Sequence, residues 1–288
     1  MKYYFFKRYF CIITYLCFHT LLFAQNKQGK VEPPLFQKLG FEEKNIIDYT
    51  SMRFYYAFNA TDINDIDTYL DLGMLQIGSK YTKYSSSFLA HSDSLVIQWQ
   101  KENSKRGYKK WIDLRGRMDG YWSEYQYSDI IIEGNTITEW AVMPRFYERE
   151  SARYTEPYPQ MKWTLNKETM EICGHKCQKA TCHYRGRDFI AWFAPDILVR
   201  KGPWKFGGLP GLIMKVYDKD NLYTFECVRI EKGKFPITQY PEKYFPASTR
   251  EKVYKYQIRM NERWGEEVIT YSSPPRQEFY EYDPLELE

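Results

Sequence analysis

Residues 202–217 read Gly-Pro-Trp-Lys-Phe-Gly-Gly-Leu-Pro-Gly-Leu-Ile-Met-Lys-Val-Tyr, a loop rich in glycine and proline that runs directly into an apolar segment. Residues 209–212 fit a type II turn, in which proline presets φ at the second position and glycine supplies a positive φ at the third. The apolar run 212–217, the polar loop 218–221 and the aromatic run 222–230 predict a β-hairpin. The glycines suggest a phosphate loop, but the spacing of phosphate-binding motifs is absent and a strand follows instead of a helix. We therefore favour an ordered loop with aromatic anchors.

Short aromatic segments bounded by Gly, Asn, Asp or Ser recur before this loop, without helical patterns between them. Even spacing of this kind is typical of antiparallel sheet. A long charged segment, residues 144–159, interrupts the series. The predicted strands are 52–58, 69–78, 80–89, 95–100, 111–114, 121–127, 136–142 and 161–165.

One helix is predicted near the end of the chain, at residues 249–264. Ser248 and Glu251 form a capping box, in which each side chain satisfies a free backbone N–H group of the first turn. Apolar residues then recur at helical spacing, and a glycine stands where the helix would end. These residues are Val253, Tyr256, Met260, Trp264 and Gly265. The apolar stripe predicts a helix that packs on the sheet.

The first 24 residues have the pattern of a secretory signal peptide. Lys2, Lys7 and Arg8 precede an apolar run that is too short to span a bilayer and ends at Ala24. We predict an exported chain, soluble in the periplasm or cell envelope, with a polar leader at 25–50 and a single domain at 51–288. No later stretch is apolar enough to span a membrane.

Charge and composition narrow the range of partners. Cleavage at Ala24 would remove three positive charges and no negative one, leaving 38 Lys and Arg against 37 Asp and Glu. The charges are scattered without runs of one sign, so electrostatics gives no case for binding nucleic acid. Aromatic residues are abundant, with 27 Tyr, 18 Phe and 8 Trp.

Cysteine and histidine cluster at residues 173–183, and Cys227 follows. If residues 176–185 are one strand, Cys177 and His183 share a face and Cys182 points to the other, so they cannot converge on one metal ion. Cleavage at Ala24 would leave four of the six cysteines, and an even number in an exported chain makes disulfides the default. We favour a Cys177–Cys227 bridge, with Cys173 and Cys182 as a possible second pair, although four cysteines allow three connectivities. The alternative is a soft-metal site formed by Cys173, His175, Cys177 and His183.

No catalytic motif is present. The sequence lacks a nucleophile elbow, a metalloprotease helix motif and a serine–lysine motif. The carboxylates at 124, 129, 133 and 139 are interpreted as the solvated face of a sheet. The chain is therefore not predicted to be an enzyme, and no catalytic residue or cofactor is assigned.

Several segments resemble the GLPGLI family of exported bacterial proteins, named for the hexapeptide found here at residues 208–213. The resemblance rests on residues 72–78, 92–95, 156–163, 174–180, 184–196 and 202–213. It implies an exported, envelope-associated protein whose activity, catalytic residues and cofactor are not established. It also favours the Cys177–Cys227 bridge, because cysteine is expected at position 177 in relatives, whereas Cys173 and Cys182 look like additions.

Taken together, the residues and the resemblance predict a mainly β fold, a large curved antiparallel sheet or open half-barrel with a C-terminal helix packed on it. The expected function is a non-catalytic binding or assembly factor of the cell envelope. Its ligand is an apolar small molecule or an envelope protein or peptide, held by Trp204, Phe206, Leu209 and Pro210. The alternative is a copper-type metal-binding or redox protein that uses residues 173–183.

Overall fold

The computed structural model describes residues 44–91, 94, 123–143, 147–262 and 282–288. The predicted signal peptide and the predicted strands at 95–100 and 111–114 lie outside these residues. Within the described part of the chain, no helix is long and apolar enough to cross a membrane.

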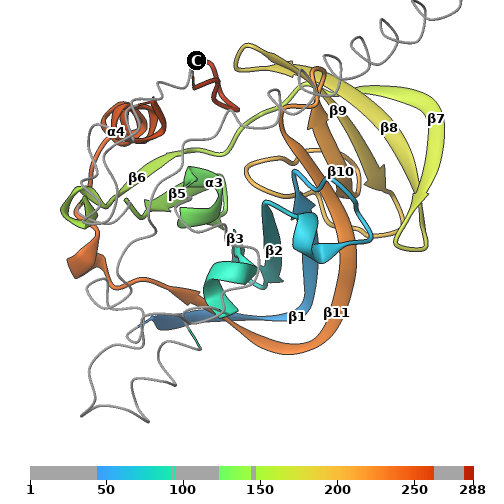
Figure 1. Ribbon diagram of the computed structural model, residues 1–288. Helices are drawn as coiled ribbons and strands as arrows, with labels where there is room; N and C mark the ends of the chain where they lie inside the picture. The colour runs from blue at the N-terminus through green and yellow to red at the C-terminus, as the bar shows by residue number, and fades with distance from the viewer. Residues whose placement is uncertain (1–43, 92–93, 95–122, 144–146, 263–281) are drawn as a thin grey trace, which may run out of the picture.

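The described strands form one antiparallel, open sheet of eleven strands (Figure 1). Its order, β6-β5-β4-β3-β2-β1-β11-β10-β9-β8-β7, contains two runs of sequence neighbours that are joined where the first strand pairs with the last. The predicted mainly β fold with a packed C-terminal helix is confirmed. The strands are β1 (Asn45–Phe58), β2 (Asp71–Gly78), β3 (Tyr81–Ser86), β4 (Ser128–Glu133), β5 (Thr136–Ala141), β6 (Ala152–Pro157), β7 (Thr164–Ile172), β8 (His175–Tyr184), β9 (Arg187–Ala194), β10 (Leu212–Asp218) and β11 (Thr224–Gln239).

The long pair of β1 and β11 forms the centre of the sheet. Their register runs from Asn45 opposite Gln239 to Phe58 opposite Phe225, and it shifts at three places along the pair. Such irregularities bend a strand and increase its twist. Figure 1 shows both strands curving through the molecule. The bent pair therefore sets the curvature of the sheet.

The connection between the two edge strands requires the sheet to curl. Strands β6 and β7 lie at opposite edges, yet they are joined by residues 158–163 alone. Such a connection spans at most about 25 Å. Eleven strands laid flat would place the two edges about 48 Å apart. The edges must therefore approach one another, which produces the open half-barrel.

Side chains of β1 are buried on both faces of the sheet. Phe54, Tyr56 and Phe58 belong to the main aromatic core, whereas Tyr55 and Ala57 pack in a second cluster with Tyr69 and Leu72. This division follows the alternation of side chains along a strand. Aromatic side chains are thus buried on both faces of the sheet.

The C-terminal helix α4 (Arg250–Glu262) confirms the prediction for residues 249–264. Its cap differs, because Thr249 Oγ1 accepts the hydrogen bond from the backbone N–H of Lys252, whereas the backbone N–H of Ser248 bonds to Arg153. The buried face combines the predicted Val253 and Met260 with two polar residues, Gln257 and Asn261. Trp264 and Gly265 lie outside the described residues.

Three local predictions were wrong. Instead of continuing a strand over residues 121–127, the chain forms a short helix α3 (Glu124–Tyr127), because Ser123 accepts a hydrogen bond from the backbone N–H of Tyr125 and begins a turn. β6 lies inside the charged segment 144–159 and ends at Pro157, which an edge strand tolerates. β1 begins at Asn45, within the segment predicted as a leader.

The turn predicted at residues 209–212 was also wrong. The positive φ belongs to Gly208, at +91°, and not to Gly211. Gly211 is required for a different reason, since a Cβ there would lie 2.3 Å from the backbone oxygen of Ala194. The loop is therefore pressed against the end of β9.

We predict that Gly211→Ala lowers the free energy of unfolding by about 2–3 kcal/mol, because a backbone carbonyl cannot move aside for the new methyl group. The matched control is Gly134→Ala, at a positive φ of +57° in open space, where only the left-handed conformation costs about 1 kcal/mol. Urea denaturation of both variants measures the difference. Equal losses would contradict the close contact at Gly211.

Candidate functional site

The loop of residues 202–211 places one lysine in the interior. Trp204 and Phe206 are buried in the aromatic core, 5.0 Å from the rings of Tyr125 and Phe189 respectively. Trp204 adopts a left-handed φ of +53°. Lys205, between them, has a side chain that is only 2% exposed. The two aromatic anchors therefore fix the position of a buried ammonium group.

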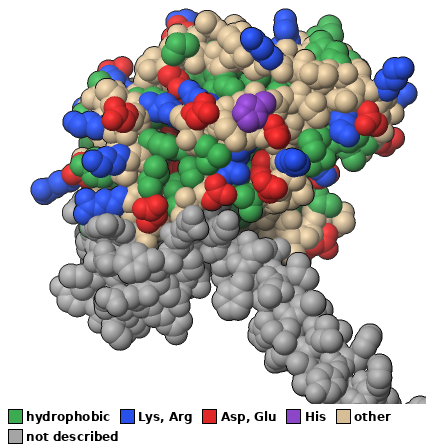
Figure 2. Space-filling view, turned by 90° about the horizontal axis from the view of Figure 1, so that it is seen from above, with side chains coloured by type: hydrophobic (Ala, Val, Ile, Leu, Met, Phe, Trp, Pro, Cys, Tyr) green, Lys and Arg blue, Asp and Glu red, His purple; other side chains and the backbone are tan. Residues whose placement is uncertain are grey.

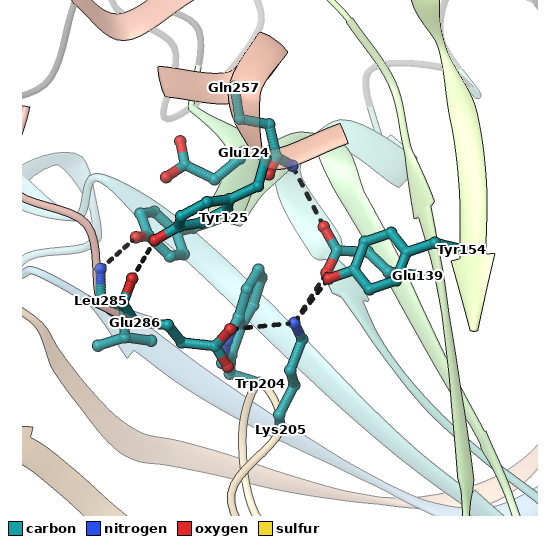
Figure 3. A pocket seen from close by; sticks show the side chains of 10 residues that line it. Glu124, Tyr125, Glu139, Tyr154, Trp204, Lys205, Gln257, Leu285 and Glu286 are labelled. Carbon is teal, nitrogen blue, oxygen red and sulfur yellow. Dashed lines mark hydrogen bonds and ion pairs between the residues drawn. The ribbon is translucent and has the colours of Figure 1, made fainter. Parts of the chain in front are cut away.

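Lys205 is surrounded by carboxylates from distant parts of the chain. Its Nζ lies 3.0 Å from Glu139 Oε2 in β5, 3.2 Å from Glu156 Oε1 in β6 and 3.5 Å from Glu286 Oε2. It also donates a hydrogen bond of 2.9 Å to the hydroxyl of Tyr154. Figure 3 shows the ammonium group between Glu139 and Glu286. One side chain thus joins the loop, one edge of the sheet and the residues after α4.

Two arginines complete the cluster. Arg185 donates hydrogen bonds to Glu156 Oε2 and Glu286 Oε2, at 2.7 and 2.6 Å. Arg250, at the start of α4, donates to the same Glu286 oxygen at 2.9 Å. We call Lys205, Arg185 and Arg250 the carboxylate site, because all three contact Glu286. With Glu139 and Glu156 the three cations face three carboxylates, so the cluster is balanced in charge.

The ionisation of these groups follows from their mutual attraction. Burial alone would raise the pKa of Glu139 and Glu286, but the nearby charge of Lys205 overcomes it and both pKa values are lowered. Burial disfavours the charged form of Lys205, yet Glu139 and Glu286 raise its pKa well above the usual value. All three groups are therefore ionised at neutral pH.

Residues 282–288, which we call the tail segment, are held by their backbone as well as by Glu286. The backbone N–H of Leu285 donates to the Tyr125 hydroxyl at 2.8 Å, and that of Leu287 donates to the Arg185 carbonyl at 3.0 Å. The Glu286 carbonyl accepts a hydrogen bond from the hydroxyl of Tyr254. The Leu285 side chain is buried in the main core. The tail segment is thus bound as a peptide is bound, through backbone groups, one apolar anchor and one charge.

A small pocket lies beside this cluster, with room for about one water molecule. Its lining includes Lys205, Glu139 and Glu286 together with Tyr254 and Gln257 of α4 (Figure 3). Glu124 also lines it. Burial raises the pKa of the Glu124 carboxyl from 4.5 to about 7, against the opposing hydrogen bond from Asn261. The pocket therefore holds an acid that titrates near neutral pH.

The residues predicted to bind a ligand do not form an exposed surface together. Trp204, Phe206 and Leu209 are buried in the main core, and Pro210 is exposed. Aromatic rings on the inner face of the sheet pack against one another, as Phe58 and Phe225 do at 4.7 Å. The described aromatic side chains therefore fill the interior instead of lining an open cavity.

The four described cysteines are free thiols. Neither predicted pairing, Cys177–Cys227 or Cys173–Cys182, is formed in the structure. Instead, Cys173 contacts Cys227, with Cys173 Sγ 3.1 Å from the Cys227 carbonyl oxygen. Cys182 lies in the core opposite Phe189. Both disulfides stay predictions about the oxidised chain.

The predicted metal ligands are divided between two environments. His183 is exposed and pairs across the strands with Asp188 at 2.8 Å, and His175 pairs with Asp196 at 2.7 Å. Cys177 is buried. Among the residues that the structure describes, no group of three or more His, Cys, Asp or Glu side chains could hold a metal ion.

Sequence reasoning missed the carboxylate site. Glu124, Asp129 and Glu139, interpreted as solvated, are buried, and Asp129 pairs with Lys83 at 2.6 Å. A usable signal was the polar pair Gln257 and Asn261 on the predicted apolar face of the helix. These amides donate to Glu139 and Glu124, at 3.2 and 3.1 Å. Buried amides on a helix indicate polar partners beneath it.

Comparison with known proteins adds little about activity. A family model described as "Protein of unknown function (Porph_ging)" matches residues 185–215, which include β9 and the whole loop of residues 202–211. No curated protein matches the chain. Two solved structures, titled "Structure of PNGF-II" in the C2 and P21 space groups, are similar at 12% identity and a TM-score of 0.42. Each match covers 73% of this chain but only 33–34% of the other, so the chain spans about a third of their length.

We predict that Lys205→Met lowers the free energy of unfolding by about 3–5 kcal/mol, because it leaves buried carboxylates without their shared cation. Lys215→Met is the control, since Lys215 pairs with Glu226 at 2.7 Å but both side chains are 26% exposed, and its loss costs about 1 kcal/mol or less. Urea denaturation at neutral pH measures both. A Lys205 variant as stable as the Lys215 variant would contradict the role of the cluster.

The raised pKa of Glu124 predicts a pH dependence of stability. Because the folded chain keeps this proton up to about pH 7 and the unfolded chain releases it near 4.5, the contribution is complete below 4.5 and disappears as the pH rises through 7. Wild type should therefore lose about 3 kcal/mol more than Glu124→Gln between pH 4.5 and 8. Denaturation of both chains at the two pH values checks this. Parallel losses would show that the pKa of Glu124 is the same in the folded and the unfolded chain.

Proposed function

We propose that this protein is an exported binding or assembly factor of the bacterial cell envelope, and that its carboxylate site binds an acidic peptide segment of a partner protein. The observation that carries the proposal is the binding of Glu286, whose carboxylate contacts Lys205, Arg185 and Arg250 together. The resemblance to the GLPGLI family, which is exported, supports the location.

The charge of the site selects a carboxylate. Without Glu286, three cations would face only Glu139 and Glu156. A buried excess of positive charge is costly, so the site favours a ligand that brings one negative charge. Arginine holds a carboxylate with directed N–H groups, which adds geometric selectivity to the attraction.

The remaining contacts of the tail segment favour an extended peptide over a small acid. Hydroxyl and carbonyl groups of Tyr125, Arg185 and Tyr254 pair with backbone groups of the tail segment. Arg187 donates from Nε to the carbonyl oxygen of Pro284 at 2.9 Å. Backbone pairing of this kind gives affinity to any chain, whereas side-chain positions give specificity. The contacts of the tail segment thus support an acidic peptide as the ligand of the site.

An apolar small molecule is less well supported, because the described aromatic side chains pack into the core. Nucleic acid is also not favoured. Lys and Arg side chains are interspersed with Asp and Glu on the face shown in Figure 2, in keeping with the near-neutral balance of the chain. The partner we propose is therefore an envelope protein with an exposed acidic segment.

A peptide-binding experiment on the full chain tests the proposal. The variant Glu286→Gln keeps the shape of the tail segment but removes its charge, and Glu288→Gln is the matched control on an exposed neighbour. A fluorescent peptide, Tyr-Asp-Pro-Leu-Glu-Leu-Glu, should bind the Glu286 variant at least about tenfold more tightly than wild type, whose own tail segment competes at high effective concentration. Fluorescence anisotropy measures the affinity.

A second peptide, with Gln at the position that corresponds to Glu286, tests whether the site binds the carboxylate of the peptide. It should bind the Glu286 variant about tenfold more weakly, a loss of about 1.4 kcal/mol. Wild type and the Glu288 variant should bind each peptide with the same affinity. If the folded Glu286 variant binds both peptides equally or neither of them, the carboxylate site serves stability alone and the proposed function is wrong.

A further inference from the structure

A second chemical arrangement lies apart from the carboxylate site, at the turn between β7 and β8. Cys173 is the first turn residue and has a left-handed φ of +49°. Its thiol is exposed, whereas Cys227, in the central strand β11, is buried. Cys173 Sγ donates to the carbonyl oxygen of Cys227 at 3.1 Å. The curvature of the sheet has thus brought the tip of an edge hairpin onto its central pair of strands.

The two thiols are chemically unlike one another. A hydrogen bond between the two thiols, separate from the one to the carbonyl oxygen, lowers the pKa of Cys173 to about 7, against an opposing effect of burial and with a smaller contribution from the charge of His175. The same hydrogen bond, together with burial, raises the pKa of Cys227. An exposed thiol that ionises readily beside a buried one is the arrangement of thiol–disulfide exchange sites.

We propose that Cys173 and Cys227 form a reversible disulfide, in which Cys173 exchanges with the disulfide of a partner protein and Cys227 resolves the mixed disulfide. The proposal is independent of the peptide-binding function. It fits the predicted export, because disulfides persist outside the cytoplasm.

Each step of the exchange is balanced. The Cys173 thiolate attacks one sulfur of the partner's disulfide, so a mixed disulfide forms and the partner's other sulfur leaves as a thiolate. Cys227 then gives up its proton and attacks Cys173 Sγ, which releases the partner's second thiolate. The partner's two thiolates take up the two protons lost by the cysteines. The cysteines lose two electrons, and the partner's disulfide gains them.

The two remaining cysteines are both buried thiols. Burial raises the pKa of Cys177 to about 11 and that of Cys182 to about 12. Cys182 is in the core on β8, opposite Phe189 of β9, and serves as the control. Cys177 is the competing partner, since the sequence predicts a Cys177–Cys227 bridge.

The full chain, first reduced and then equilibrated with oxidised glutathione, provides the test. Peptide mapping without reductant should find a Cys173–Cys227 link, absent from Cys173→Ser and Cys227→Ser and unchanged in Cys182→Ser. The Cys227 variant should accumulate glutathione on Cys173, because the resolving thiol is missing, and wild type should carry at least about tenfold less.

The outcomes that overturn the proposal are equally specific. A Cys177–Cys227 link, or no link at all, excludes the assigned pair. A wild type that carries as much glutathione on Cys173 as the Cys227 variant excludes the resolving role. If Cys227→Ser fails to fold, alkylation of reduced wild type decides the matter, since Cys173 should react at least about tenfold faster than Cys182. Equal rates would contradict the exchange role of Cys173.

Discussion

The structure depends on keeping one ammonium group, that of Lys205, away from water. An isolated ion in the interior would cost several kcal/mol, so the fold must bring it compensating charge from wherever the chain can supply it. That charge comes from Glu139, Glu156 and Glu286, which lie far apart in the sequence. The curvature of the sheet, the position of the loop and the path of the tail segment are therefore linked, because together they bring these carboxylates to Lys205.

The loop that carries Lys205 also fills the space between the two edges of the curled sheet. A curled sheet whose edges do not pair leaves a gap, and residues 158–163 cross from one edge to the other. The loop packs against this crossing, where Tyr158 and Trp163 donate hydrogen bonds to the carbonyl oxygens of Phe206 and Gly207, at 3.3 and 2.8 Å. Lys205 then reaches the carboxylates of β5 and β6. The gap is thus filled by protein with both apolar and ionic contacts.

The sequence was sufficient for features that depend on local patterns. Short aromatic segments bounded by turn residues predicted most of the described strands, and helical spacing of apolar residues predicted α4. It was insufficient where strand propensity competed with helix capping. At Ser123 the capping hydrogen bond begins α3, although the residues that follow have high strand propensity. It failed for the carboxylate site because no spacing links a loop lysine to carboxylates on other strands. Such a site can be recognised only from the folded structure, in which the topology of the sheet places those elements together.

The pairing of β1 with β11 has a consequence for the order in which the protein is completed. Asn45 has its partner at Gln239, and Lys205 has one of its carboxylates at residue 286. During synthesis the hairpin of β2 and β3 can form early, whereas the central pair must wait for β11 and Lys205 must wait for Glu286. Contacts so distant in sequence make folding slow. The local hairpins therefore form before the central strand pair that joins them, and the buried cation is neutralised late in folding.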